Sequence, residues 1–132
     1  MADYLPLRLP PGADLRAALL EAIGARDCRA AFVVAGIGSL AGARLRLAGA
    51  AETSALTGDL EILSVSGTLG EGGAHLHMAV ADAQGRVTGG HVAEGCIVRT
   101  TAELLLALLP GQRFAREPDP ATGYLELAIR PR

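Results

Sequence analysis

The sequence predicts an α+β fold of about seven mostly antiparallel strands with one or two helices. Several short segments alternate apolar and polar residues, which is typical of half-buried strands. One early segment has apolar residues at helical spacing, and 17 glycines supply tight turns between elements. The chain has 132 residues, the size of one domain, and neither a linker nor a repeat divides it. We therefore expect a single domain over residues 1–132.

The amino-terminal half contains the one clear helix. Asp14 can cap it, apolar residues recur at helical spacing through Ile23, and Gly24 lies near its end. Alternation or a continuous apolar run predicts four strands, over residues 4–9, 30–35, 44–47 and 59–68. The segment Gly36–Ser39 is expected to interrupt the second of these strands.

A β-hairpin over residues 74–93 is the clearest pattern in the carboxy-terminal half. Its connection, Asp82-Ala83-Gln84-Gly85, suits a three-residue loop in which Gly85 is left-handed. This loop pairs Asp82 with Arg86 and so fixes the register of the two strands.

The remaining carboxy-terminal segments contain one strand and one ambiguous stretch. Residues 123–129 alternate and predict a strand. Residues 100–109 are leucine-rich, and Thr100 with Glu103 resembles a capping box, which favours a helix. The residues just before them read as strand, so both alternatives stay open from pattern alone.

Composition argues against several classes of function. With 12 basic and 14 acidic residues the net charge is −2, whereas a protein that binds nucleic acid by phosphate neutralisation alone is expected to be basic. Aromatic residues make up 3% and tryptophan is absent, which disfavours base-stacking platforms. Cys28 and Cys96 lie far apart without a CxxC motif, so we expect two buried, reduced thiols, with one disulfide as the alternative.

Nothing in the sequence predicts a membrane protein. The first residues lack the basic segment of a signal peptide. The longest apolar stretches are too short and too glycine-rich to span a bilayer. We expect a cytoplasmic protein with no membrane contact.

The three histidines of the chain all lie in the predicted hairpin, at positions 75, 77 and 91. Residues two apart on a strand point to the same side, so His75 and His77 share a face. In the predicted register His91 lies opposite His77, where facing Cβ atoms are about 4.5–5.5 Å apart. The three imidazoles are therefore expected to converge.

Three converging imidazoles predict a divalent metal site. Three histidines and a water are the open tetrahedral set of catalytic zinc, and availability makes zinc the expected ion. The alternatives are a hydrogen-bonded polar cluster and a subunit interface without metal. The candidate outer partners of the imidazoles are the carboxylates of Glu71, Asp82 and Glu94, for which solvated surface positions are the alternative.

The serines and glycines indicate no catalytic triad or nucleotide fingerprint. No serine stands in a GxSxG context, and Gly36-Ile37-Gly38 lacks a third glycine and a following helix. Arg44, Arg46 and Arg99 are expected on solvated strand faces rather than in an anion site.

An ordered set of motifs resembles the PPC (plant and prokaryote conserved) domain family over nearly the whole chain. The most specific stretch is His75-Leu76-His77 followed by Asp82, Gly85 and Gly89-Gly90-His91. The other matching segments are Tyr4 with Arg8–Pro10 and the helix 14–23, Gly36–Ser39, Glu61–Gly67, Phe114–Glu117 and Thr122–Leu127.

The resemblance implies a homotrimer in which residues 100–108 continue as a strand, and His75, His77 and His91 bind a metal ion, commonly zinc. Plant members carry AT-hook segments and bind DNA, but this chain has no Arg-Gly-Arg-Pro hook and no basic tail. The resemblance brings no settled activity for the stand-alone prokaryotic domain.

The sequence therefore leaves three candidate functions. The first is a homotrimeric metal-binding protein with one coordination position open to water or a ligand. The second is an accessory protein associated with DNA or with DNA-binding proteins. The third is a metal-dependent hydrolase or lyase, for which the sequence supplies no identifiable general base.

Overall fold

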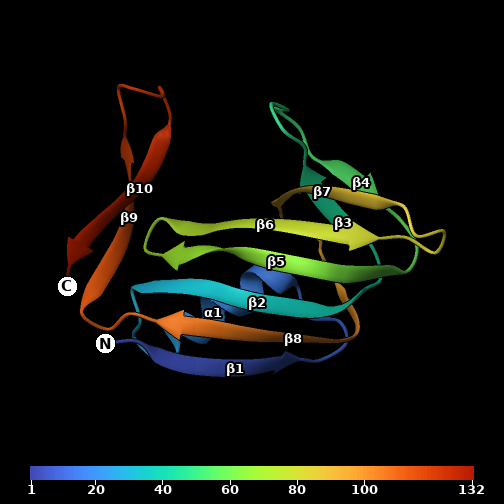
Figure 1. The fold of residues 1–132 in the computed structure, drawn as a ribbon, viewed down its shortest axis with the longest axis horizontal. Coiled ribbons are helices and arrows are strands. Elements are labelled where there is room, and N and C mark those ends of the chain that lie inside the picture. The colour runs from blue at the N-terminus through green and yellow to red at the C-terminus, as the bar shows by residue number, and fades with distance from the viewer.

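The computed structural model describes all 132 residues, and its order of elements confirms the α+β class (Figure 1). The elements are β1 (Asp3–Leu9), α1 (Leu15–Gly24), β2 (Ala30–Leu40), β3 (Ala43–Arg46), β4 (Ser54–Leu56), β5 (Leu60–Gly70), β6 (Gly73–Ala81), β7 (Val87–Val92), β8 (Val98–Leu108), β9 (Gln112–Pro118) and β10 (Leu125–Pro131). Eight strands form one antiparallel sheet in the order β1-β8-β2-β5-β6-β7-β3-β4. Strands β9 and β10 pair separately as a hairpin that projects from this sheet.

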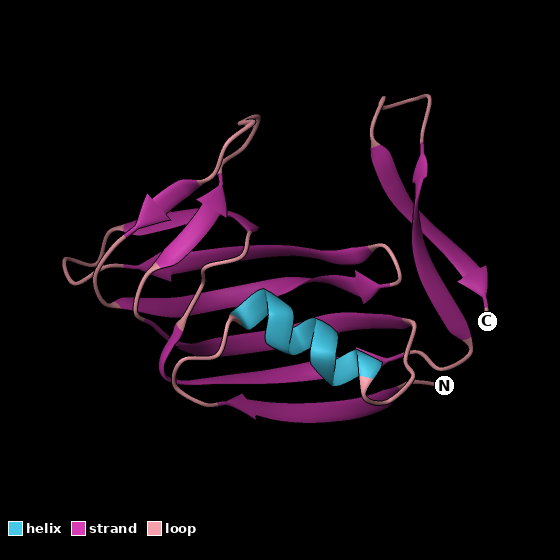
Figure 2. Cartoon of the chain, turned by 180° about the vertical axis from the view of Figure 1, so that it is seen from behind, coloured by secondary structure: helices cyan, strands magenta, loops and turns pink.

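The single helix covers one face of the large sheet (Figure 2). One carboxylate oxygen of Asp14 accepts a hydrogen bond from the Ala17 amide at 3.0 Å, which caps the helix as predicted. The other oxygen accepts from the Gly95 amide at 2.7 Å and ties the helix start to the loop before β8. No helix in the structure has both the length and the apolar character needed to cross a bilayer.

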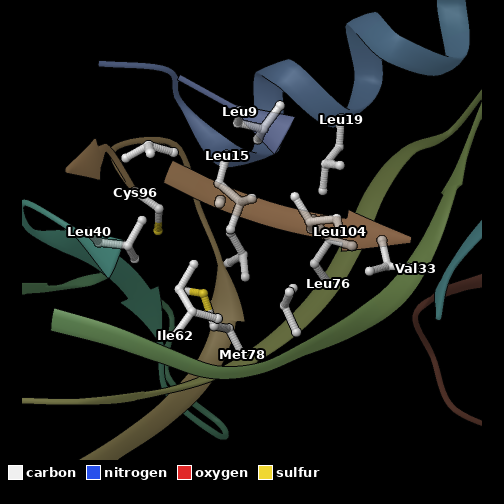
Figure 3. Packing of buried hydrophobic residues seen from close by; sticks show 14 of the residues in the cluster. Leu9, Leu15, Leu19, Val33, Leu40, Ile62, Leu76, Met78, Cys96 and Leu104 are labelled. Atoms are coloured by element: carbon white, nitrogen blue, oxygen red, sulfur yellow. The ribbon is translucent and has the colours of Figure 1, made fainter. Parts of the chain in front are cut away.

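The core lies between α1 and the sheet. Leu15, Leu19 and Ile23 repeat at every fourth position and are buried. Figure 3 shows Leu15 and Leu19 above side chains of the sheet, Leu76 and Leu104 among them. No helix covers the opposite face, on which Phe114 of β9 packs against Phe32 of β2.

The ambiguous segment 100–108 is part of strand β8, as the family resemblance implied. β8 lies between β1 and β2 and pairs with both. Its buried residues alternate with more exposed ones and are Val98, Ala102, Leu104, Leu106 and Leu108. Pairing on both edges and burial of one face override the helix propensity of the leucines.

The predicted interruption at Gly36–Ser39 is wrong, because β2 continues through this segment to Leu40. The glycines here permit close packing rather than a turn. A Cβ on Gly38 would lie 2.6 Å from the carbonyl oxygen of Thr101, and a Cβ on Gly36 would lie 3.0 Å from a methyl of Leu104. Gly38 therefore lets the backbone of β8 approach β2, whereas Gly36 leaves room for the side chains of Val65 on β5 and Leu104 on β8.

Two strands were not indicated by the sequence pattern. β4 spans three residues, which is too short for alternation to be recognised. β9 has Phe114 as its only large apolar residue, so no alternating pattern marks it.

Candidate metal centre

The turn between β6 and β7 fixes the position of the histidines. The Asp82 amide donates to the carbonyl of Arg86 at 2.9 Å, and the Gly85 amide donates to the carbonyl of Asp82 at 2.9 Å. Gly85 has a φ of +78°, the left-handed conformation that the three-residue loop requires. One Asp82 carboxylate oxygen also accepts from the Gln84 and Arg86 amides, both at 2.9 Å. The predicted register, in which His77 pairs with His91, is confirmed.

The three imidazoles lie together on one face of the hairpin. The ring centres are 5.1 Å apart for His75 and His77, 4.7 Å for His77 and His91, and 5.7 Å for His75 and His91. One ring nitrogen from each residue can be chosen so that all three lie within 4.8 Å of one another. Leu76 and Met78 alternate with His75 and His77 and are buried on the opposite face. Burial of that face turns the histidines outward.

His91 is oriented by the neighbouring strand. Its Nδ1 lies 3.0 Å from the carbonyl oxygen of Arg46, which is its register partner on β3. A carbonyl oxygen can only accept, so this contact requires the proton on Nδ1 and leaves the lone pair on Nε2. The Arg46 carbonyl thus fixes the tautomer in which Nε2 can bind a metal ion.

None of the three predicted outer carboxylates fills this role, because none of them hydrogen-bonds to an imidazole. Glu71 instead forms ion pairs with Arg29 at 3.5 Å and Arg113 at 3.3 Å. Asp82 is engaged in the hairpin turn, and Glu94 makes no hydrogen bond to the cluster. The outer partner of His91 is a backbone carbonyl, which no pattern of side-chain types could indicate.

The surroundings of His75 favour a neutral imidazole. Burial lowers the pKa of His75 below its usual value, and the nearby charges of Arg116, His77 and His91 lower this pKa further. The carboxylate of Glu126 acts in the opposite direction. Since a metal ion binds only the neutral ring, this environment reduces competition from protons.

A cavity of about 900 Å³ opens beside the histidines. His75 and Ala74 from β6 and His91 from β7 line one part of it, and the remaining lining residues come from two arms of the fold. These are Arg46 with Gly49, Ala50 and Ala51 from β3 and the β3–β4 connection, Arg116 from β9, and Tyr124, Leu125 and Glu126 just before and at the start of β10. Figure 1 shows both arms, β3–β4 and β9–β10, extending beyond β6 on the same side of the sheet.

Sequence patterns missed the charged residues of this cavity. Arg46, Arg116 and Glu126 belong to segments far apart in the chain, and only tertiary packing brings them to the histidines. Arg46 does follow the alternation of a solvated strand, as expected, but it also contributes to the site. The register of β3 against β7 was the one signal that could have identified it, and turn chemistry does not specify that register.

The fold and the cluster together define a small α+β protein with a candidate three-histidine metal centre on a β-hairpin. Residues 3–110 match the Plants and Prokaryotes Conserved (PCC) domain. The chain therefore belongs to this family, which is the one that its motifs resemble.

Several known proteins are similar to the chain. The bifunctional protein GlmU of Synechococcus sp. (strain JA-3-3Ab) is 53% identical over 124 residues, which cover 94% of this chain and 20% of the relative. The chain thus spans about a fifth of the length of the curated relatives it matches. A hypothetical protein from Salmonella cholerae-suis has a solved structure with a TM-score of 0.96 and 42% identity, covering 100% of this chain and 96% of its own.

Two more distant structures share the fold. A metal-containing protein from Archaeoglobus fulgidus has a TM-score of 0.80 and 26% identity, covering 96% of this chain and 93% of its own. A candidate DNA-binding protein from Bacteroides thetaiotaomicron has a TM-score of 0.81 and 17% identity, covering 97% of each chain. At that identity the second structure shows the fold alone.

Proposed function

We propose that this chain is a metal-binding protein in which His75, His77 and His91 hold one divalent ion, with zinc as the expected ion. The proposal depends on one observation, the convergence of three imidazoles whose candidate ligand nitrogens lie within 4.8 Å of one another. The Archaeoglobus fulgidus relative, named as metal-containing, supports it.

The donor set fits such an ion. Two nitrogens bound at about 2.0–2.1 Å to one tetrahedral ion lie roughly 3.4 Å apart, so small rotations of the rings suffice to bring the three nitrogens into place. His75 and His77 are more exposed than His91, and the Arg46 carbonyl orients the ring of His91. Three neutral ligands leave a fourth position for water or for a ligand, and a divalent ion there would act as a Lewis acid.

Metal analysis of the protein, purified without chelators and without a histidine tag, tests the proposal. We expect close to one ion per chain in the wild type and a large loss in each of the variants His75→Ala, His77→Ala and His91→Ala. Val87→Ala is the matched control, because Val87 lies on the same exposed face of the hairpin and carries no ligand atom. The metal site is refuted if the wild-type protein holds no stoichiometric ion, both as purified and after it has been reloaded with metal.

We further propose that the protein assembles as a homotrimer through the sheet face that α1 leaves uncovered. Val34, Ile37 and Leu63 on β2 and β5 are 51%, 56% and 50% exposed, which is unusual for large apolar side chains of central strands. Sedimentation equilibrium should give three times the chain mass, and Ile37→Lys should lower it. A wild-type monomer at micromolar concentration would exclude this assembly.

A metal-dependent hydrolase or lyase is the second candidate, and the cavity favours it. Such an enzyme needs an accessible metal and a nearby proton acceptor, and Glu126 lines the cavity beside His75. Once a substrate is found, this activity would be supported if Glu126→Gln no longer turns that substrate over while its metal content stays unchanged.

Association with DNA or with DNA-binding proteins is the other candidate, because the chain belongs to the family whose plant members bind DNA. The net charge of −2 favours a protein partner over direct phosphate contact. A gel-shift assay with a salt titration separates the two modes, because direct binding weakens steeply with salt.

A further inference from the structure

The cavity beside the histidines is rich in arginines. Arg46 and Arg116 line the large cavity, and Arg16 joins Arg46, His75 and His91 in the lining of a smaller pocket of about 180 Å³. Glu126 is the only acidic residue lining either space. The surroundings of the histidines therefore carry a net positive charge before any metal ion is added.

These guanidinium groups are not neutralised by carboxylates. Ion pairs engage six of the 12 basic residues, all arginines, but Arg16, Arg46 and Arg116 form none. Two of them donate to neutral oxygens instead: Arg46 to the Ala50 carbonyl at 3.2 Å, and Arg116 to the Thr68 hydroxyl at 3.2 Å. Each of these two bonds holds a guanidinium in place without cancelling its charge.

Arg116 reaches this position because Gly72 has no side chain. A Cβ on Gly72 would lie 2.6 Å from Cγ of Arg116, so the stem of the arginine packs directly against the backbone before β6. The hairpin that carries Arg116 is anchored by Phe114, which is buried against the main sheet. The arginine is thus held toward the histidines from a separate structural element.

We propose that this cavity binds a small organic anion, with one oxygen of its carboxylate or phosphate group at the open metal position and the remaining oxygen (for a carboxylate) or oxygens (for a phosphate) on Arg46 and Arg116. The proposal rests on the metal site proposed above. Arginine is suited to this role because its planar donors match the oxygens of carboxylates and phosphates.

The size and lining of the cavity indicate more than a bare inorganic ion. Its volume of about 900 Å³ is typical of sites for small molecules. The lining also includes apolar surface from Ala50, Ala51 and Leu125. A ligand with a charged head and a short apolar body fits this mixed lining.

The test uses the full chain loaded with Co²⁺, whose visible spectrum reports changes at the fourth coordination position. Metal content is measured first in every sample. Titration with succinate and, separately, with inorganic phosphate should change the spectrum and saturate, whereas the uncharged analogue succinamide should not. The relative affinities of the two anions distinguish a carboxylate ligand from a phosphate ligand.

Charge variants sharpen the test. Arg116→Gln and Arg46→Gln should each weaken the tighter anion about tenfold or more while retaining the metal, since each removes a charged hydrogen bond. Arg99→Gln is the control, because Arg99 pairs with Asp59 and does not line the cavity. Glu126→Gln should strengthen anion binding, because it removes the only acidic side chain that lines the cavity.

The outcomes separate this proposal from the one on which it rests. A protein that binds no metal refutes the metal site itself. If the protein binds metal but its spectrum shows no saturable response to either anion, only the anion site is refuted. The same holds if the anion affinity is equal in the arginine, Glu126 and control variants.

Discussion

Gly90 packs against the carbonyl oxygen of Arg46, the same oxygen that accepts the hydrogen bond from Nδ1 of His91 at 3.0 Å. A Cβ on Gly90 would lie 2.8 Å from this oxygen, closer than van der Waals contact allows. The residue before His91 must therefore be small for β3 to stay within reach of the imidazole.

Gly90→Ala is expected to disturb the metal centre without altering any ligand. The added methyl group should push β3 away from β7, with the cost of about 1–3 kcal/mol that is typical of overpacking, and should weaken metal binding. Urea unfolding and a metal titration measure the two effects. Gly111→Ala is the control, because a Cβ there meets nothing within 4 Å. Wild-type metal affinity in Gly90→Ala would show that the Arg46 contact is unimportant.

The carboxylate of Asp82 should stabilise the hairpin only while it is ionised. The hydrogen bond from the Arg86 amide, above all, holds the pKa of Asp82 below its usual value of 3.8. A lowered pKa means that the stabilisation is present above the unfolded-state value and is lost as the pH falls through the folded-state value. We expect Asp82→Asn to lower the Tm by a few degrees at pH 7, with the difference from wild type shrinking below about pH 3.8. A difference that is independent of pH would contradict this account.

The two cysteines should differ sharply in reactivity. Both are free, as expected from their spacing; Cys96 is buried and Cys28 is half-buried. Burial raises the pKa of the Cys96 thiol above 9.0, so little thiolate forms in the folded protein at pH 8. Because unfolding restores an ordinary thiol, this group also lowers the stability of the fold as the pH rises past about 9.0.

Mass spectrometry after iodoacetamide treatment checks this difference. We expect one label, on Cys28, in the native protein at pH 8 and two labels in urea. Rapid labelling of Cys96 under native conditions would mean that the core around α1 opens readily.

Phe114 should anchor the β9–β10 hairpin to the large sheet. Its ring packs edge-on against Phe32 at a centroid distance of 5.6 Å, and its backbone bonds with Arg29 and Glu71 at 2.9 and 3.0 Å. Phe114→Ala removes a side chain that is 2% exposed, and such changes cost about 3–5 kcal/mol. Hydrogen exchange across residues 112–131 should then accelerate.

The control for this change is Ile129→Ala. Ile129 pairs with Phe114 in register but is exposed, so its removal should have little effect on exchange. If the amides of residues 112–131 are equally protected from hydrogen exchange in both variants, the backbone contacts alone hold the hairpin.

Local chemistry made the histidine cluster predictable from sequence. The turn Asp82–Gly85 fixes the register of β6 and β7, and alternation then fixes which side chains share a face. The helix was predictable for the same reason, since its cap and its apolar spacing lie within a few residues.

The parts that could not be predicted depend on contacts between distant segments. The leucines of β8 favour a helix until β1 and β2 pair with both edges of the segment. Gly36 and Gly38 suggest a break until their closeness to β8 is known. Arg46 and Arg116 resemble ordinary surface residues until two arms of the fold bring them to the histidines.

The separation of the cavity lining into a part that carries the histidines and two arms has an evolutionary consequence. The imidazoles belong to the central sheet, whereas Arg116, Tyr124 and Glu126 belong to a hairpin with a small sheet of its own. Mutations in the hairpin would therefore change which molecule the proposed anion site selects without disturbing the proposed metal centre, so descendants of one ancestral scaffold could diverge in ligand choice while they keep the same three histidines.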